Sequence, residues 1–165
     1  MPVLLCDASA MWLSLVFAAA AVAKFQSFGA WPGVLQNFRL LPRALVVPVA
    51  WLLPPLELAV AIGLMVAGFR SPAAIIAALL LMLFSAAVAI NLRRGRTRID
   101  CGCFSSDLRQ ALSPALLVRN AALLVAALCL VAPGADLARP ALEIFIAAGG
   151  ALCLFFYYLS VGLIA

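Results

Sequence analysis

Apolar residues dominate the chain in long runs that are separated by short polar stretches. The longer runs approach the roughly 20 residues that an α-helix needs to cross a bilayer. Alternation with a period of two is absent, and only helices or closed barrels satisfy every backbone group in lipid. The pattern predicts an all-α integral membrane protein, a bundle of about five transmembrane helices. The predicted helices cover residues 10–28, 44–68, 72–92, 114–131 and 140–164.

The segment between the first two predicted helices, residues 29–43, has a pattern of its own. Its larger apolar side chains recur at helical spacing, at Val34, Leu35, Phe38 and Leu41. This spacing predicts a short amphipathic helix at the membrane interface, with Trp31 as its anchor among the lipid headgroups. In the next predicted helix, Pro54 and Pro55 are expected to produce a kink or to interrupt the backbone hydrogen bonds.

The composition supports a membrane protein. Of the 165 residues, 68% are hydrophobic and 10% are charged, and the mean hydropathy is +1.22. Soluble domains carry about 25% charged residues. The first apolar run lacks the basic start of a signal peptide and carries Asp7 there, so we interpret it as the first membrane helix. We expect residues 1–165 to form a single transmembrane domain embedded in the lipid bilayer.

The distribution of arginines predicts the orientation in the membrane. The formal charge is +5, but the basic residues cluster between the apolar runs, which argues against a nucleic-acid partner. One side collects Arg39, Arg43, Arg93, Arg94, Arg96, Arg98 and Arg109. The other side has Arg70 and Arg139. The positive-inside rule therefore predicts a multi-pass protein with the N-terminus outside and the loop after Arg98 inside.

Two cysteines in that loop are the main chemical feature. Cys101 and Cys103 flank Gly102, and Phe104 follows them. The neighbouring arginines favour the thiolate form, and a disulfide across one residue closes a small, strained and therefore oxidising ring. The pair is suited to accept electrons and pass them on. Two incidental thiols or a soft-metal site are alternatives, but two ligands leave a tetrahedral site half empty, and without histidine in the chain we expect no metal.

The other three cysteines carry weaker signals. We interpret Cys129 and Cys153 as small buried hydrophobic side chains. Cys6 precedes the first predicted helix and Cys129 lies near the end of the fourth, so both fall on one predicted side of the membrane. Cys6 and Cys129 are therefore a candidate second thiol site, although nothing in the sequence demands that they pair.

Ionisable side chains within the apolar runs are further candidates. Charges in a bilayer are costly, and they usually face the bundle interior and pair with each other. We predict that Glu57 pairs with Lys24, with Arg119 or with both, close to the Cys-Gly-Cys loop. Such a pair could fix the register of the helices, transfer protons or bind an anion. Asn91 and Asn120 lie in the same apolar runs.

The order of these motifs resembles a known family. The motifs are Lys24, Leu40-Leu41-Pro42, Pro54-Pro55-Leu56-Glu57-Leu58, Ala89-Ile90-Asn91-Leu92-Arg93-Arg94-Gly95, Ile99-Asp100-Cys101-Gly102-Cys103-Phe104 and Val118-Arg119-Asn120. Over residues 24–120 the chain resembles the MauE family of methylamine-utilisation membrane proteins, within the DoxX-like, redox-associated group. One departure is Ser105, where glycine is expected. The resemblance implies a four-helix DoxX-like core with an additional C-terminal helix, in the bacterial inner membrane.

The resemblance also implies a function. The family is associated with maturing or transporting the disulfide-rich small subunit of methylamine dehydrogenase, beside a thioredoxin-like periplasmic partner, MauD. Many relatives lie outside methylamine pathways, so that substrate is not assumed here. By this resemblance Cys101 and Cys103 are the redox pair. The shared core comprises Lys24, Glu57, Arg119 and Asn120.

Three functions remain open from the sequence. The first is a membrane thiol–disulfide oxidoreductase, in which Cys101 and Cys103 exchange electrons with a thioredoxin-like protein and support disulfide formation in exported proteins. A quinone or a cytoplasmic thioredoxin is a candidate for the distal electron donor or acceptor. The second is a non-enzymatic maturation factor that docks a partner. The third is a transporter of a soft metal or a thiol compound.

Overall fold

The described part of the chain is helical throughout its regular structure. This computed structural model describes residues 2–66, 68–97, 112–131 and 148–155, with side chains from Cys6 onward. The helices are α1 (Pro2–Gln26), α2 (Trp31–Asn37), α3 (Arg43–Met65), α4 (Arg70–Arg93) and α5 (Pro114–Val131). Residues 148–155 are also helical. No strand occurs in these ranges, so the predicted all-α fold is confirmed.

Four of these helices, α1, α3, α4 and α5, are long and apolar enough to cross a membrane. The chain is thus a multi-pass helical membrane protein. The fourth predicted span coincides with α5, and the second and third agree with α3 and α4 within a few residues. The fifth predicted helix overlaps the described residues only at 148–155, and the rest of it lies outside them.

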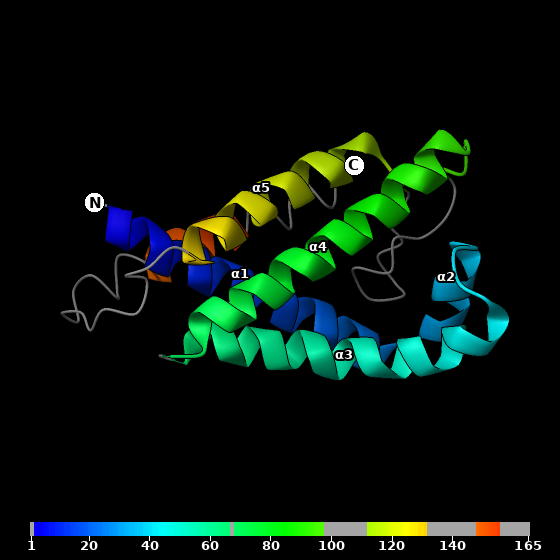
Figure 1. Cartoon of the computed structure of the whole chain (residues 1–165), viewed down its shortest axis with the longest axis horizontal. Helices are drawn as coiled ribbons and strands as arrows, with labels where there is room; N and C mark the ends of the chain where they lie inside the picture. The colour runs from blue at the N-terminus through cyan, green and yellow to red at the C-terminus, as the bar shows by residue number, and fades with distance from the viewer. Residues whose placement is uncertain (1, 67, 98–111, 132–147, 156–165) are drawn as a thin grey trace.

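The four long helices form an antiparallel bundle (Figure 1). Helix α1 packs chiefly on α3, and α4 packs chiefly on α5. Smaller contacts of α3 with α4 and of α1 with α5 complete a ring of four helices. One end of the bundle, called here the arginine-rich end, contains the ends of α1 and α4, the starts of α3 and α5, and α2. The other, called the N-terminal end, contains the starts of α1 and α4 and the ends of α3 and α5.

The two ends differ in charge as the sequence predicts. The described arginines at the arginine-rich end are Arg39, Arg43, Arg93, Arg94 and Arg96. At the N-terminal end the described part contains Arg70, whose guanidinium lies 2.9 Å from the carboxylate of Asp7. This asymmetry is the one on which the predicted orientation rests, and the orientation itself stays a prediction.

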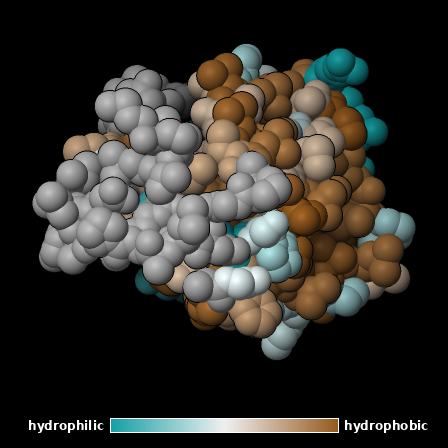
Figure 2. Space-filling view, turned by 60° about the vertical axis from the view of Figure 1, so that its left-hand side comes forward, coloured by the Kyte–Doolittle hydropathy of each residue, from teal (hydrophilic) through white to brown (hydrophobic). Residues whose placement is uncertain are grey.

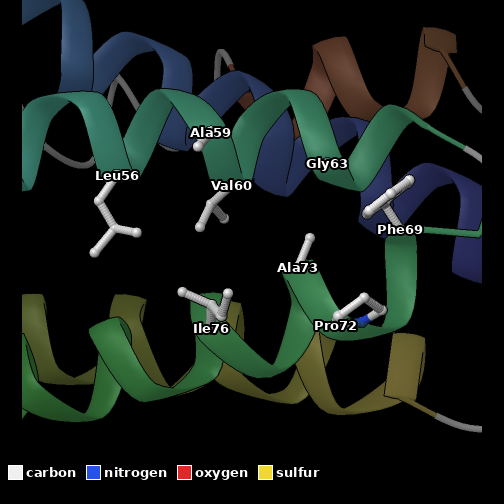
Figure 3. A pocket seen from close by; sticks show the side chains of 8 residues that line it. All are labelled: Leu56, Ala59, Val60, Gly63, Phe69, Pro72, Ala73 and Ile76. Carbon is white, nitrogen blue, oxygen red and sulfur yellow. The ribbon is translucent and has the colours of Figure 1, made fainter.

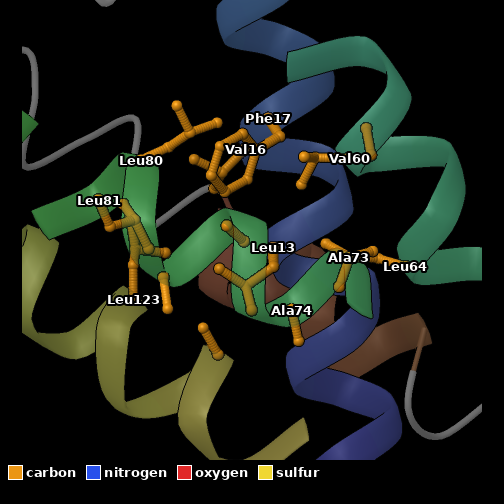
Figure 4. Close-up of a cluster of buried hydrophobic side chains, with 14 of the residues drawn as sticks. Leu13, Val16, Phe17, Val60, Leu64, Ala73, Ala74, Leu80, Leu81 and Leu123 are labelled. Carbon is orange, nitrogen blue, oxygen red and sulfur yellow. The ribbon is translucent and has the colours of Figure 1, made fainter. Parts of the chain in front are cut away.

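The core lies on the axis of the bundle. Leu13, Val16 and Phe17 from α1 meet Val60 and Leu64 from α3 there, and α4 and α5 add further leucines and alanines (Figure 4). Most of the outer surface is also apolar, as Figure 2 shows for one face. The most exposed large apolar side chains include Trp51, Leu52, Phe69, Leu83, Val118 and Val125. Water would penalise such a surface, whereas lipid matches it.

Small residues allow α3 and α4 to approach each other closely. A Cβ atom added at Gly63 would lie 2.9 Å from the Cβ of Ala73, which is too close for any real pair of side chains. Ala73, Ala74, Ala77 and Ala78 are all buried along the same helix. In lipid the hydrophobic effect gives little drive for helix association, so such close packing supplies much of the adhesion.

Helix α1 begins earlier than predicted. The expected start at residue 10 is wrong, because α1 already begins at Pro2 and ends at Gln26 rather than at residue 28. Asp7 does not terminate the helix, since Arg70 at the start of α4 neutralises its carboxylate. Asp7, which precedes the predicted start of this helix, is thus accommodated inside it.

The short helix between the first two spans exists, but the predicted role of Trp31 is wrong. Trp31 begins α2 and is only 3% exposed, so it packs into the bundle and does not anchor the helix among headgroups. Phe38 at the end of α2 is also buried. The apolar face of α2 therefore covers protein, and the ring of Trp31 covers a buried charge.

The prolines do not interrupt the second span. Helix α3 runs without a break through Pro48, Pro54 and Pro55. Pro54 and Pro55 each lack a backbone N–H, so the carbonyl oxygens of Ala50 and Trp51, four residues earlier, have no helical hydrogen-bond donor. The expected loss of backbone hydrogen bonds at Pro54 and Pro55 therefore holds, but the helix itself continues through both prolines, and it is locally short of backbone donors just before Glu57.

Candidate functional site

A buried ion pair joins α1 to α3 near the arginine-rich end. The Nζ atom of Lys24 lies 2.8 and 2.9 Å from the two carboxylate oxygens of Glu57. The two residues are 2% and 1% exposed. A third acceptor, the carbonyl oxygen of Ala20, lies 3.4 Å from Nζ. The predicted pairing of Glu57 with Lys24 is confirmed.

Both charged residues occupy core positions of their helices. Glu57 follows Leu53 and precedes Val60 and Leu64 on the buried face of α3. Lys24 continues the buried stripe of α1 that includes Phe17 and Ala21. Residues three or four positions apart share one face of a helix, so the sequence spacing itself turns both charges inward.

Two aromatic rings enclose the ammonium group. Nζ of Lys24 lies 5.0 Å from the ring centre of Trp31 and 5.7 Å from that of Phe84. Both distances fit cation–π attraction, which strengthens away from water. The indole Nε1 of Trp31 is itself buried and has no hydrogen-bond partner in the described structure. The sequence singled out neither ring for this role.

Amide side chains connect α4 to its neighbours. The Asn120 Nδ2 donates to the hydroxyl of Ser85 at 3.3 Å, and Ser85 donates to the carbonyl oxygen of Leu81 at 2.7 Å. Phe84, which contacts the Lys24 ammonium, and Ser85, which contacts Asn120, are consecutive residues of α4. Helix α4 therefore contacts a polar group of α1 through Phe84 and one of α5 through Ser85.

A backbone hydrogen bond joins the residues that follow α4 to those that precede α5, and we call this contact the neck. Arg96 donates to the side-chain oxygen of Asn91 at 3.2 Å. Leu112 N donates to the carbonyl oxygen of Thr97 at 3.1 Å. Leu112 is buried beside Phe38, Val88 and Leu116. The chain thus leaves and returns at one hydrogen-bonded point of the arginine-rich end, on either side of residues 98–111.

Several predicted site residues cannot be placed together here. Cys101, Gly102, Cys103 and Phe104 lie outside the described residues, so their pairing stays a prediction. Arg119 is half-buried on α5 beside Asn120, and its proposed pairing with Glu57 also stays a prediction.

The candidate second thiol site is brought together. Cys6 Sγ lies 3.7 Å from the carbonyl oxygen of Cys129, and both cysteines are free thiols. Cys129 and Cys153 are exposed on the outside of the bundle, so the interpretation of both as buried side chains is wrong. The outer surface of a membrane helix tolerates a thiol because cysteine behaves as a small hydrophobe.

An apolar groove lies between α3 and α4 (Figure 3). Its volume is about 150 Å³, and it is lined by Leu56, Ala59, Val60, Gly63, Phe69, Pro72, Ala73 and Ile76. None of these side chains can donate a hydrogen bond to a quinone carbonyl, so this groove does not fit a quinone headgroup. Among the described residues no group of three or more Cys, Asp or Glu side chains could hold a metal ion.

The fold and the buried pair define a class, a helical membrane bundle with four candidate spans in its described part and a buried ion pair between two of them. Comparison with known proteins specifies it further. The family described as "Methylamine utilisation protein MauE" matches residues 3–133. The chain belongs to this family.

Individual relatives agree with this assignment. The chain is 47% identical to "Methylamine utilization protein MauE" of Paracoccus denitrificans over 131 residues, 79% of this chain and 70% of that protein. It is 44% identical to the protein of that name from Methylorubrum extorquens, over 88% of this chain and 80% of the relative. With that from Methylophilus methylotrophus it shares 53% identity over 58% of this chain and half of the relative. No solved structure matches the chain.

Proposed function

We propose that this protein is a membrane thiol–disulfide oxidoreductase whose Cys101–Cys103 pair exchanges electrons with a thioredoxin-like protein. The observation that carries the proposal is the neck between Thr97 and Leu112, from which the cysteine-bearing segment leaves and returns at the arginine-rich end. Arg93 and Arg94 are exposed at the same end. Cationic surroundings favour the thiolate, which is the reactive form of cysteine.

The reaction is ordinary thiol–disulfide exchange. A thiolate of the partner attacks the Cys101–Cys103 disulfide and forms a mixed disulfide, while one cysteine leaves as thiolate. The second thiolate of the partner then attacks the mixed disulfide, which leaves the partner oxidised and this pair as a dithiol. Two electrons pass to the membrane protein in one cycle. The opposite direction reverses each step.

We propose a positioning role for the Lys24–Glu57 pair. A lysine ammonium has three hydrogen-bond donors, and three acceptors surround Nζ: the two Glu57 oxygens and the Ala20 carbonyl oxygen. An ammonium with all donors engaged is suited to fix helix register rather than to pass on a proton. The pair holds α1 against α3 below the start of α2.

The proposed setting is the bacterial inner membrane, with the arginine-rich end inside. The names of the relatives support a role in methylamine utilisation, in which the customer is a disulfide-containing exported protein. An inside location of Cys101 and Cys103 would require a second route for electrons between this pair and customers outside. The docking-factor hypothesis avoids this requirement, because it needs no electron transfer.

Replacement of the pair separates these two functions. A Cys101→Ser, Cys103→Ser variant is expected to abolish maturation of the exported disulfide protein in cells that depend on this membrane protein. Cys153→Ser is the matched control, because it removes an exposed thiol from another part of the chain. Full maturation with the double variant would contradict the redox function and favour docking.

A further inference from the structure

The start of α1 and the end of α5 place two thiol-bearing residues against each other, although they lie far apart in the sequence. The thiol of Cys6 reaches the backbone of Cys129, with 3.7 Å between Sγ and the carbonyl oxygen. Both helices reach the N-terminal end of the bundle (Figure 1). Neither cysteine has a part in the ion pair or in the neck described above.

The position along the bundle matters for access. Asp7 follows Cys6 directly and binds Arg70 at 2.9 Å, and this ion pair marks a level where polar side chains are tolerated. Cys129 lies two residues before Val131, the last residue of α5. The two thiols therefore lie near the boundary of the apolar span, within reach of a partner in the aqueous phase.

The two cysteines differ in exposure. Cys129 is exposed, whereas Cys6 is half-buried and packs against the core. In an exchanging pair, the more accessible thiol is the one that a partner protein can meet first. The geometry thus gives Cys129 the attacking role and Cys6 the resolving role.

We propose that Cys6 and Cys129 form a second thiol–disulfide site, at the end of the bundle opposite the Thr97–Leu112 neck. The rise of α5 from Pro114 to Cys129 is about 22 Å, so this site serves the other face of the membrane. The proposal rests on the proposed redox function, because it supplies the second route that electrons need. Its oxidant is the disulfide of a thioredoxin-fold protein.

The exchange balances in two steps. Cys129 thiolate attacks the disulfide of the partner, which forms a mixed disulfide and releases one partner thiolate. Cys6 thiolate then attacks the Cys129 sulfur, which forms the Cys6–Cys129 disulfide and releases the second partner thiolate. The two cysteine protons pass to the two partner thiolates. The pair loses two electrons and the partner gains them.

Formation of the bond requires the two sulfurs to approach each other further. A disulfide requires the two sulfurs at about 2.05 Å and Cα atoms about 4.4–6.8 Å apart. Cys6 Sγ already contacts the main chain of Cys129, and both residues lie near the ends of their helices.

The test isolates this pair in the full-length protein. A Cys101→Ser, Cys103→Ser, Cys153→Ser variant keeps only Cys6 and Cys129 of the five cysteines. After treatment with glutathione disulfide in membranes, we expect maleimide to label neither thiol before reduction and both after reduction. Adding Cys6→Ser should leave Cys129 as a stable mixed disulfide with glutathione. Adding Cys129→Ser should leave Cys6 with several-fold less glutathione in intact mass spectra.

The outcomes also separate this proposal from the first one. Two labelled thiols in the oxidised three-serine variant, or only cross-links between chains, would overturn the second site. Peptide mapping of oxidised wild-type protein should show the Cys6–Cys129 link, and a Cys129–Cys153 link instead would also overturn it. If Cys6–Cys129 forms while Cys101 and Cys103 prove dispensable for maturation, the first proposal fails and the second site stands.

Discussion

The two ends of the bundle differ in how deeply their ion pairs are buried and in the charges around them. At the arginine-rich end, the buried ammonium of Lys24 lies beside two aromatic rings and pairs with buried Glu57, while Arg93 and Arg94 are exposed. At the N-terminal end, partly buried Arg70 is matched by Asp7, and of the two neighbouring thiols Cys129 is exposed and Cys6 is half-buried. The first end combines a buried ion pair with exposed arginines, whereas the charges of Asp7 and Arg70 balance each other in the described part of the second. This difference suits a thiolate-stabilising site at one end and a neutral contact site at the other.

The largest effect should come from breaking the buried Lys24–Glu57 pair. Lys24→Met leaves the Glu57 carboxylate buried without its cation, which typically costs about 3–5 kcal/mol. We expect this loss in the free energy of unfolding, measured in detergent micelles. The double variant Lys24→Met, Glu57→Leu should recover most of it, because an apolar pair carries no desolvation penalty. If Lys24→Met were as stable as the wild type, Glu57 could not be closed off from water as its burial indicates.

A smaller effect should follow from crowding the α3–α4 contact at the N-terminal end. Gly63→Ala places a methyl group 2.9 Å from the Cβ of Ala73. Overpacking of this kind costs about 1–3 kcal/mol and should exceed the gain in helix propensity. Gly33→Ala is the matched control, because nothing lies within 4 Å of its added Cβ. Thermal denaturation should show opposite signs for the two variants, and equal shifts would refute the close packing.

The ion pair at the N-terminal end should matter less than the Lys24–Glu57 pair. Asp7→Asn removes the charge partner of Arg70, but the Arg70 side chain is 16% exposed and can turn towards water. We expect a loss of about 1 kcal/mol, measured in the same micelles. A loss as large as that of Lys24→Met would show that the two ends are equally closed.

The smallest effect should come from Trp31→Phe. The substitution keeps an aromatic ring over Lys24 and removes the buried indole N–H that has no partner. Loss of cation–π strength and relief of an unsatisfied donor should nearly cancel, so the free energy of unfolding should change by less than about 1 kcal/mol. A large loss would instead indicate that the indole N–H has a partner in the membrane-embedded protein.

The sequence predicted the spans well because helix length and apolar composition follow directly from bilayer thickness. It also predicted the Lys24–Glu57 pair, because isolated charges in apolar runs must find each other. It failed for Trp31 and Asp7. Whether an interfacial helix packs on lipid or on protein, and whether an acid has a cation on another helix, depends on tertiary contacts that periodicity does not contain.

The approach of Cys6 to Cys129 lies between these cases. The alternation of spans predicted that both residues face the same side, but not that α1 and α5 are neighbours in the ring. Cys129 and Cys153 were predicted to be buried, but both are exposed, so that prediction was wrong. Burial within an apolar helix cannot be inferred from apolarity when the solvent is lipid.

The central claim, electron exchange at Cys101 and Cys103, is tested most directly by trapping the mixed disulfide. On a background in which Cys6, Cys129 and Cys153 are replaced by serine, membranes containing the Cys103→Ser and Cys101→Ser variants would be oxidised with glutathione disulfide and then incubated with a reduced thioredoxin-like protein whose resolving cysteine is replaced by serine. The Cys101→Ser, Cys103→Ser double variant on the same background is the control. We predict a covalent heterodimer through one of the two cysteines, which reductant dissolves and which the double variant cannot form. Absence of this species from both single variants, with the partner thiol still reactive, would contradict the account.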